Sequence, residues 1–192
     1  MDIKEILTDS PTEKIVPGFG PMTSDVLILG TQPSSLAYKH PIQNVLMHHA
    51  AIDPSLCRFE SVMQENGMKP SKEQTIRYGH AVMGRINEIK PRIIIALGKV
   101  AMLALGIKGP LSVLHGTSTK IIAGVQQYTV YSMYDPDAAQ LNPDIMPSLI
   151  SDWKQLGREL NELTTREVDP VDAALEEEGW MVAPKALRLT TA

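Results

Sequence analysis

Hydrophobic positions gather into short runs separated by longer amphipathic stretches, a pattern that predicts an α/β fold. The segments 26–29 and 93–97 are apolar at consecutive positions, and Gly30 and Gly98 follow them directly. Apolar runs of this length without polar alternation are typical of strands that helices cover on both faces of a parallel sheet. The glycines predict tight loops at the carboxyl ends of both strands.

Stretches with helical periodicity alternate with these strands. The first begins at Ser71, a suitable N-cap, and stops before Pro91. A short helix is predicted after Gly98. The last helix begins near Pro147 and repeats large apolar residues on one side as far as Leu163.

Two further strands are predicted at 120–122 and 127–132, on either side of Gly124, and the second runs into the sequence YDPDAA. Strands that alternate with helices predict a three-layer αβα domain with a central, mostly parallel sheet and ligands at the carboxyl ends of its strands. We assign residues 1–165 to this domain and 166–192 to an acidic C-terminal extension. A lid, a dimer contact and a loose end all remain open for the extension.

Composition is that of an ordinary globular protein, with 192 residues, 43% hydrophobic and 21% charged. The sequence has no apolar run of ~18 residues and no pattern of a secretory signal at its start. We therefore expect a cytoplasmic protein with no membrane partner. The sequence does not define the oligomeric state, and a monomer is favoured.

Charge and cysteine content narrow the possible partners. The net charge is −4, but residues 25–165 carry 13 Lys and Arg against 12 Asp and Glu, so the acidity lies in the two ends. No basic stripe indicates a strong nonspecific DNA binder, and any DNA contact must be local. Cys57 is the single cysteine, which excludes a four-cysteine zinc or iron–sulfur site within one chain. No cofactor and no metal are expected.

Five motifs follow one another in a distinctive order: LGTQPSS, INEIKPRIIIALGKVAM, PLSVLHG, YDPDAA and DWKQL. This order resembles the uracil-DNA glycosylase superfamily, most closely its bacterial iron–sulfur branches, over roughly residues 22–160. The resemblance implies a monofunctional DNA glycosylase that flips a base out of DNA and leaves an abasic site. It places 30–33 in the first catalytic loop and Asp135-Pro-Asp137 in the family's His-Pro-Ser loop.

The chain departs from the family at both catalytic loops. Gln32 stands before the proline of the first loop, where it can hold a water molecule but is a poor base. The cysteines of the cluster are missing, so no iron–sulfur cluster is expected. In the family, a histidine at the position of Asp135 donates a hydrogen bond to the pyrimidine as negative charge develops on it, and a carboxylate would repel that charge.

Two roles for Asp135 are chemically sensible. It is either protonated in a dry pocket and acts as an acid, or it stabilises the cationic sugar and activates water. We favour the second role, and we give Asp137 a structural role. Taken alone, the sequence DPDAA indicates an Asx-type turn after a strand.

The base-reading position depends on the alignment of residues 44–58. If IDPSLCR replaces the family's strand-Asn-x-x-x-Cys-Arg pattern, Asp53 stands at the position of the family's Asn. Its carboxylate would then accept a hydrogen bond from the exocyclic amine of cytosine. Excision of plain cytosine would be lethal, which favours a modified cytosine. Members of the superfamily that this chain resembles attack hypermodified phage bases, so the resemblance implies hydroxymethylcytosine or its glucosylated form in phage DNA and a role in anti-phage defence. Alternatively, VLMHHAAI is the strand, and His48 or His49 faces the base.

Several other residues are candidates for contacts with DNA. Tyr38 is the aromatic residue that could stack on a flipped base, Ser34 and Ser35 could bind phosphates, and His115-Gly116 stands where the family carries Arg-Gly. The alternative is that these residues only pack in the core or form turns, without contacting DNA.

Three other functions compete with the predicted activity. They are a catalytically silent member of the fold that binds DNA or a partner protein, a drifted uracil-DNA glycosylase, and a small nucleotide-binding α/β protein. The last lacks a Gly-x-Gly-x-x-Gly motif and a phosphate-binding loop.

Overall fold

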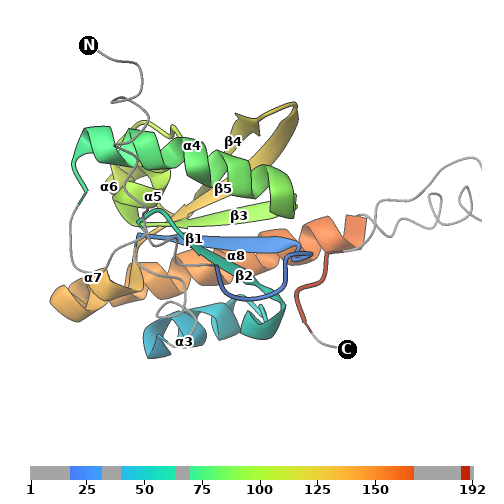
Figure 1. Cartoon of the computed structure of the whole chain (residues 1–192). Helices are drawn as coiled ribbons and strands as arrows, with labels where there is room; N and C mark the ends of the chain where they lie inside the picture. Colours follow the sequence, from blue (N-terminus) through green and yellow to red (C-terminus); the bar gives the residue numbers. More distant parts are fainter. Residues whose placement is uncertain (1–17, 32–39, 64–69, 167–186, 191–192) are drawn as a thin grey trace, which may run out of the picture.

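Five strands form a single sheet in the computed structural model, which describes residues 18–31, 40–63, 70–166 and 187–190 (Figure 1). The strands are β1 (Val26–Gly30), β2 (Arg58–Ser61), β3 (Ile93–Leu97), β4 (Thr117–Ala123) and β5 (Gln126–Met133). Their order is β2-β1-β3-β5-β4, with β4 antiparallel to β5 and the other neighbours parallel. The predicted mostly parallel sheet is confirmed.

Helices cover both faces of this sheet. They are α3 (Pro41–His49), α4 (Lys72–Ile89), α5 (Gly98–Ala104), α6 (Leu111–Leu114), α7 (Pro136–Leu141) and α8 (Met146–Arg166), with 3-10 turns η1 (Pro54–Leu56) and η2 (Pro143–Ile145). Figure 1 shows α4 and α5 on one face of the sheet and α3 and α8 on the other. The domain therefore has the predicted three αβα layers.

The alternation of side chains along each strand builds two separate cores. In β1, Val26 and Ile28 pack into the core beneath α3 and α8, whereas Leu27 and Leu29 pack beneath α4 and α5. All five residues of β1 and all five of β3 are buried. Burial on both faces explains why these strands are apolar at consecutive positions.

The strongly patterned elements lie where the sequence predicts them. Strand β3 has the predicted bounds, and α4 begins after Ser71, whose side chain forms a capping box with Gln74. Helix α8 begins at Met146, one residue before the predicted Pro147. Strands β4 and β5 are each longer than predicted: β4 also contains the polar residues 117–119 and the buried Ala123, and β5 also contains the exposed Gln126 and the buried Met133.

Between β1 and α4, the observed secondary structure differs from the sequence predictions in two places. VLMHHAAI is not a strand, because its first residues form the end of α3. Strand β2 was missed, since its sequence Arg-Phe-Glu-Ser carries two charges. Glu60 is only 3% exposed and lies 2.8 Å from Arg58 Nη2 and 3.0 Å from Arg85 Nε. Two guanidinium groups thus compensate a buried carboxylate, which a hydrophobic pattern cannot reveal.

Residues 187–190 lie against the domain at the amino end of β1. Leu187 is buried in the core beneath α3 and α8, the Asp53 amide donates to the Leu189 carbonyl at 2.7 Å, and the Arg188 amide donates to Asp25 at 3.0 Å. This part of the C-terminal extension is therefore attached to the domain. No helix in the described ranges is long and apolar enough to cross a membrane.

Candidate active site

The carboxyl ends of β1, β3 and β5 lie side by side at one edge of the sheet. From β1, the chain proceeds to β2 on one side, while β3 and β5 extend the sheet on the other. A reversal of strand order of this kind opens a crevice between neighbouring strands, where ligands bind in α/β proteins. In Figure 1, helix α7 lies at this edge. The residues that follow the strands are Thr31, Gly98 and Tyr134.

Asp135 stands at this edge, directly after β5 and Tyr134, and is the N-cap of α7. Its Oδ1 accepts a hydrogen bond from the Asp137 amide at 3.0 Å. The carboxyl group packs against Gly98, where an added Cβ would lie 3.2 Å from the Asp135 Cβ. Gly98 has φ +82, a backbone conformation that favours glycine. The turn therefore brings Asp135 against the start of α5.

Burial raises the pKa of Asp135 above its ordinary value. The hydrogen bond from the Asp137 amide lowers this pKa, the Asp137 charge raises it, and His40 lowers it, but desolvation is the largest influence. Asp135 is a half-buried carboxyl group whose ionisation is disfavoured by its surroundings. Such groups are common at catalytic sites, although structural carboxyl groups share the property.

His40 connects the start of α3 to α7. Its Nε2 lies 3.0 Å from Asp137 Oδ1, and its Nδ1 accepts from the Gln43 backbone amide at 3.3 Å. Acceptance at Nδ1 assigns the proton of the neutral ring to Nε2, which then donates to Asp137. Both ring nitrogens are thus engaged in holding the two helices, which gives His40 and Asp137 structural roles.

His115 and Asp152 form a second pair at the same edge. His115 Nδ1 lies 2.7 Å from Asp152 Oδ2 of α8, and the imidazole ring lies 4.6 Å from the ring of Tyr134. Gly116 leaves space for this carboxylate, because a Cβ there would lie 2.6 Å from Asp152 Oδ1. The Gly116 amide donates to the Ser132 carbonyl at 2.8 Å, which ties the pair to β5.

The pairing with Asp152 determines what His115 can do. A carboxylate that accepts from Nδ1 leaves Nε2 as the ring nitrogen for a ligand. The neutral ring would accept a hydrogen bond at Nε2, and the protonated ring would donate one. His115 therefore combines an oriented ring with a side chain that is 26% exposed.

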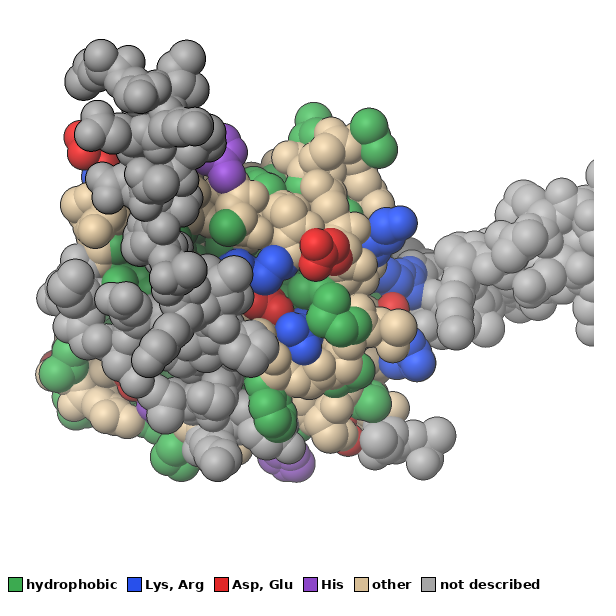
Figure 2. Space-filling model, in the orientation of Figure 1, with side chains coloured by type: hydrophobic (Ala, Val, Ile, Leu, Met, Phe, Trp, Pro, Cys, Tyr) green, Lys and Arg blue, Asp and Glu red, His purple; other side chains and the backbone are tan. Residues whose placement is uncertain are grey.

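Two apolar side chains project from the short helices of the site region. Leu141, at the end of α7, is 89% exposed, and Val113 of α6 is 69% exposed. On the part of the face in Figure 2 that is drawn in colour, positive and negative side chains are interspersed, without a continuous basic patch.

The structure does not bring the predicted base-reading residues to this edge. Asp53 precedes η1 and β2, whose first residue, Arg58, pairs with Leu27 near the amino end of β1. His48 lies with Asp53 around one surface hollow, and His49 lines another beside α8. Since parallel strands share their direction, Asp53, His48 and His49 lie at the edge opposite Asp135 and are left out of the candidate site.

Other predicted site residues fall outside the part of the chain that the structure describes. These are Gln32, Ser34, Ser35 and Tyr38. The residue at the carboxyl end of β2, the position nearest to the site on that strand, is Ser61. Its hydroxyl is buried and donates to the Met63 carbonyl at 2.7 Å.

Asp152, His40 and Leu141 were missed as members of this region. Asp152 lies within the DWKQL motif, but its partner is 37 residues away, so its role is visible only in three dimensions. Leu141 carried a usable signal, because it is a large apolar residue directly after DPDAAQ, a sequence without large apolar side chains.

No group of three or more His, Cys, Asp and Glu side chains that could hold a metal ion is found within residues 18–31, 40–63, 70–166 and 187–190. No family model and no curated protein matches the chain in sequence. The likeness to the uracil-DNA glycosylase superfamily thus rests on the ordered motifs.

Proposed function

We propose that the protein is a monofunctional DNA glycosylase that hydrolyses the N-glycosidic bond of a pyrimidine flipped out of DNA. The observation that carries this proposal is Asp135, a half-buried carboxyl group at the carboxyl edge of the sheet, in the motif that resembles the family's second catalytic loop. An α/β fold alone supports many activities, so the argument rests on the chemistry of this edge.

The reaction requires one carboxylate in a defined position. As the bond between C1′ and N1 breaks, positive charge develops on the sugar and negative charge on the base. The ionised Asp135 would stabilise the sugar cation and accept a proton from the water molecule whose oxygen bonds to C1′. The base departs with the electron pair of the broken bond and then takes up a proton, and an abasic site remains.

The alternative role for Asp135 is that of a protonated acid. Its raised pKa favours this form more than that of an ordinary aspartate. However, Oδ1 accepts a hydrogen bond from the Asp137 amide, which favours the carboxylate, and desolvation would strengthen its attraction to a sugar cation. We therefore retain the carboxylate role, which predicts activity that rises with pH as Asp135 ionises.

Neighbouring groups supply the contacts with DNA. His115, oriented by Asp152, is assigned to a phosphate or to the base, where its protonated ring would donate a hydrogen bond. Leu141 is assigned to the space that the flipped base leaves in the stack, since apolar side chains commonly act as wedges between base steps. DNA is the expected partner, and the proposed hydrolysis uses no cofactor.

The base itself needs a direct test. Asp53 was the residue that favoured cytosine, and its position opposite Asp135 removes that support. We therefore state the proposal for a pyrimidine and keep hydroxymethylcytosine and its glucosylated form as the first modified cytosines to test. Uracil is the second candidate, because the resemblance is to enzymes of uracil excision.

The test is incubation of the purified chain with matched DNAs that carry uracil, cytosine, hydroxymethylcytosine or glucosylated hydroxymethylcytosine. Abasic sites are revealed by alkaline cleavage, and Asp135→Ala is compared with Asp53→Ala. Both variants remove the N-cap of a short turn that begins with Asp-Pro, so they are matched for local structural damage.

Cleavage of one base, abolished by Asp135→Ala and kept by Asp53→Ala, is the expected result. Intact DNA in every lane, with the folded chain still binding DNA, would replace the glycosylase with a silent DNA-binding protein. Equal loss in both variants would remove Asp135 from the chemistry.

A further inference from the structure

A cavity of about 600 Å³ lies between α4 and α5, the two helices that cover one face of the sheet. Gly79 and Ala104, both in its lining, mark the place where the two helices touch. A Cβ at Gly79 would lie 2.5 Å from the Ala104 carbonyl oxygen. The backbones thus meet without a side chain between them, and the residues around this point form the cavity wall.

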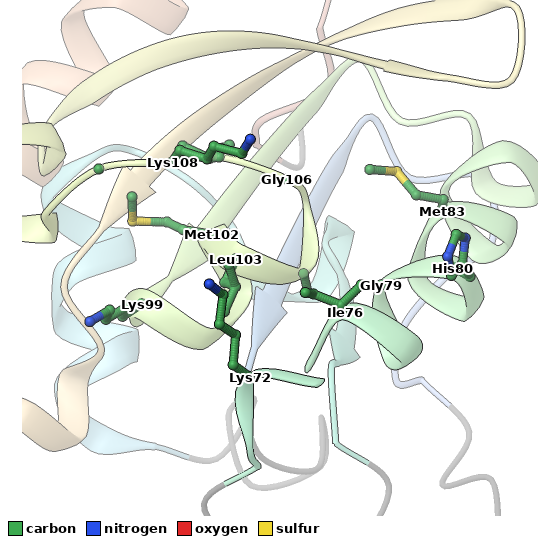
Figure 3. A pocket seen from close by; sticks show the side chains of 13 residues that line it. Lys72, Ile76, Gly79, His80, Met83, Lys99, Met102, Leu103, Gly106 and Lys108 are labelled. Atoms are coloured by element: carbon green, nitrogen blue, oxygen red, sulfur yellow. The ribbon is translucent and has the colours of Figure 1, made fainter. Parts of the chain in front are cut away.

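The inner wall is apolar and contains two methionines. Figure 3 shows Met102 and Leu103 of α5 at one end, and Met83 of α4 at the other. Ile76 of α4 also lines the cavity and is 50% exposed. The helical pattern of α4 places Ile76 among core residues, yet the structure leaves it facing this hollow. Met83 is partly exposed, and its flexible side chain can adapt to differently shaped apolar groups, whereas Met102 is buried in the core.

Among the residues that the structure describes, the rim carries only positive or neutral groups. Lys72, Lys99 and Lys108 line the cavity together with His80, and no Asp or Glu does so, although the whole chain has a net charge of −4. The side chains of these three lysines form no hydrogen bond or ion pair within the part of the chain that the structure describes. An anionic group at the rim would therefore meet unneutralised charge.

The placement of two of these lysines costs the fold some stability. Lys72 is the first residue of α4, and Lys99 is the second residue of α5. Positive charge in the first turn opposes the helix dipole, whose amino end is itself positive. The lysines attract negative charge to the rim, although Glu73 shares the first turn of α4 with Lys72.

We infer that this cavity is a docking site for an acidic amphipathic peptide segment of another protein, its apolar side chains in the hollow and its carboxylates against the lysines. The groove between two helices with an adaptable apolar wall fits apolar anchors spaced by three or four residues. DNA phosphates would satisfy the lysines but would leave Ile76, which is 50% exposed, in contact with water. This inference is independent of the proposed glycosylase activity.

The test measures binding and needs no substrate of the enzyme. A fluorescent helical peptide with leucines at positions i, i+3, i+4 and i+7 and glutamates between them is titrated with the full chain, and anisotropy gives the dissociation constant. A peptide of the same composition with its leucine stripe broken is the first control. A peptide with lysine in place of glutamate is the second.

The matched variants reverse charge on opposite faces of the sheet. Lys72→Glu with Lys108→Glu alters the rim, and glutamate at position 72 also suits the start of α4, so loss of folding is not expected. Lys154→Glu makes the same kind of change at an exposed position of helix α8. We expect the rim variant to weaken binding about tenfold or more, Ile76→Ser to weaken it as well, and Lys154→Glu to leave it unchanged.

Equal binding of the leucine-stripe peptide and its scrambled control would overturn the inference, as would equal binding by the rim variant and the unaltered chain. Binding of duplex DNA, but not of the acidic peptide, that is lost on rim reversal would assign the cavity to nucleic acid instead. Binding of a free long-chain carboxylic acid, with no binding of the peptide, would assign it to a small amphiphile.

Discussion

Asp53-Pro54 and Asp135-Pro136 form nearly the same local structure at opposite ends of the sheet. In each turn the aspartate is the N-cap of a short helical segment and accepts a hydrogen bond from the amide two residues on, at 2.8 Å in the first turn and 3.0 Å in the second. This is the expected behaviour of an Asp-Pro pair. The local sequence therefore does not distinguish the two turns.

Their surroundings separate them. Asp53 precedes its strand, and its Oδ1 also accepts from the Ser55 hydroxyl at 2.7 Å. Asp135 follows its strand, packs against Gly98 and has its pKa raised by burial. Cys57, near Asp53, is a buried thiol whose pKa is raised to about 12 by desolvation and by the Asp53 charge, which makes it a poor nucleophile. The comparison teaches that position relative to the sheet, and not the turn itself, selects the candidate site.

The largest expected difference between the two turns is catalytic. Asp135→Asn keeps the shape and the N-cap but cannot accept a proton from water, so the rate of base excision should fall by about 10²- to 10⁴-fold. Asp53→Asn should leave the rate unchanged. Single-turnover kinetics on the best DNA substrate measure both, and similar rates for the two variants would contradict the assignment.

The pair formed by His115 and Asp152 should give a smaller loss at the same edge. Asp152→Asn removes the carboxylate that holds the imidazole ring, and we expect about a tenfold lower rate or affinity for DNA, equivalent to ~1.4 kcal/mol. If the two residues act as a unit, His115→Ala combined with Asp152→Asn should be no worse than His115→Ala alone. Additive losses would separate the roles of the two residues.

Gly98 tests the packing that brings Asp135 into place. Gly98→Ala puts a Cβ at φ +82 and 3.2 Å from the Asp135 Cβ, and it should lower the free energy of unfolding by about 1–2 kcal/mol. Gly84→Ala in α4 is the control, since nothing lies within 4 Å of an added Cβ there. It should raise stability by about 0.4–1 kcal/mol. Urea unfolding distinguishes the two, and equal effects would remove the strain argument.

The smallest expected effect is a pH dependence of stability. Because the folded-state pKa of Asp135 is raised, the stability that this group contributes is complete below its unfolded pKa and is lost as pH rises through its folded pKa. Asp135→Asn removes this loss, so the variant should be more stable than the unaltered chain at pH 7. The difference in Tm should shrink as pH falls through the carboxyl range. A gap that widens in acid would mean that ionised Asp135 stabilises the fold.

The elements that sequence reasoning located have strong patterns of their own. The buried run of β3 and the capping box at Ser71 each lie within a few consecutive residues, so their bounds needed no tertiary information. Strand β2 and helix α3 were not located. The charge on Glu60 is compensated by Arg85 of α4, a partner 25 positions away that the pattern of β2 itself cannot show.

The sequence by itself determined the class of fold, the loops after the apolar strands and the Asp-Pro turns, because helical period, strand alternation and turn formation act between near neighbours. Only the tertiary structure decided that Asp135 and the pair of His115 and Asp152 lie at one edge and that Asp53 lies at the other. The reason is physical. Strand order and direction are set by packing of whole layers, and side chains far apart in the chain meet only after those layers form.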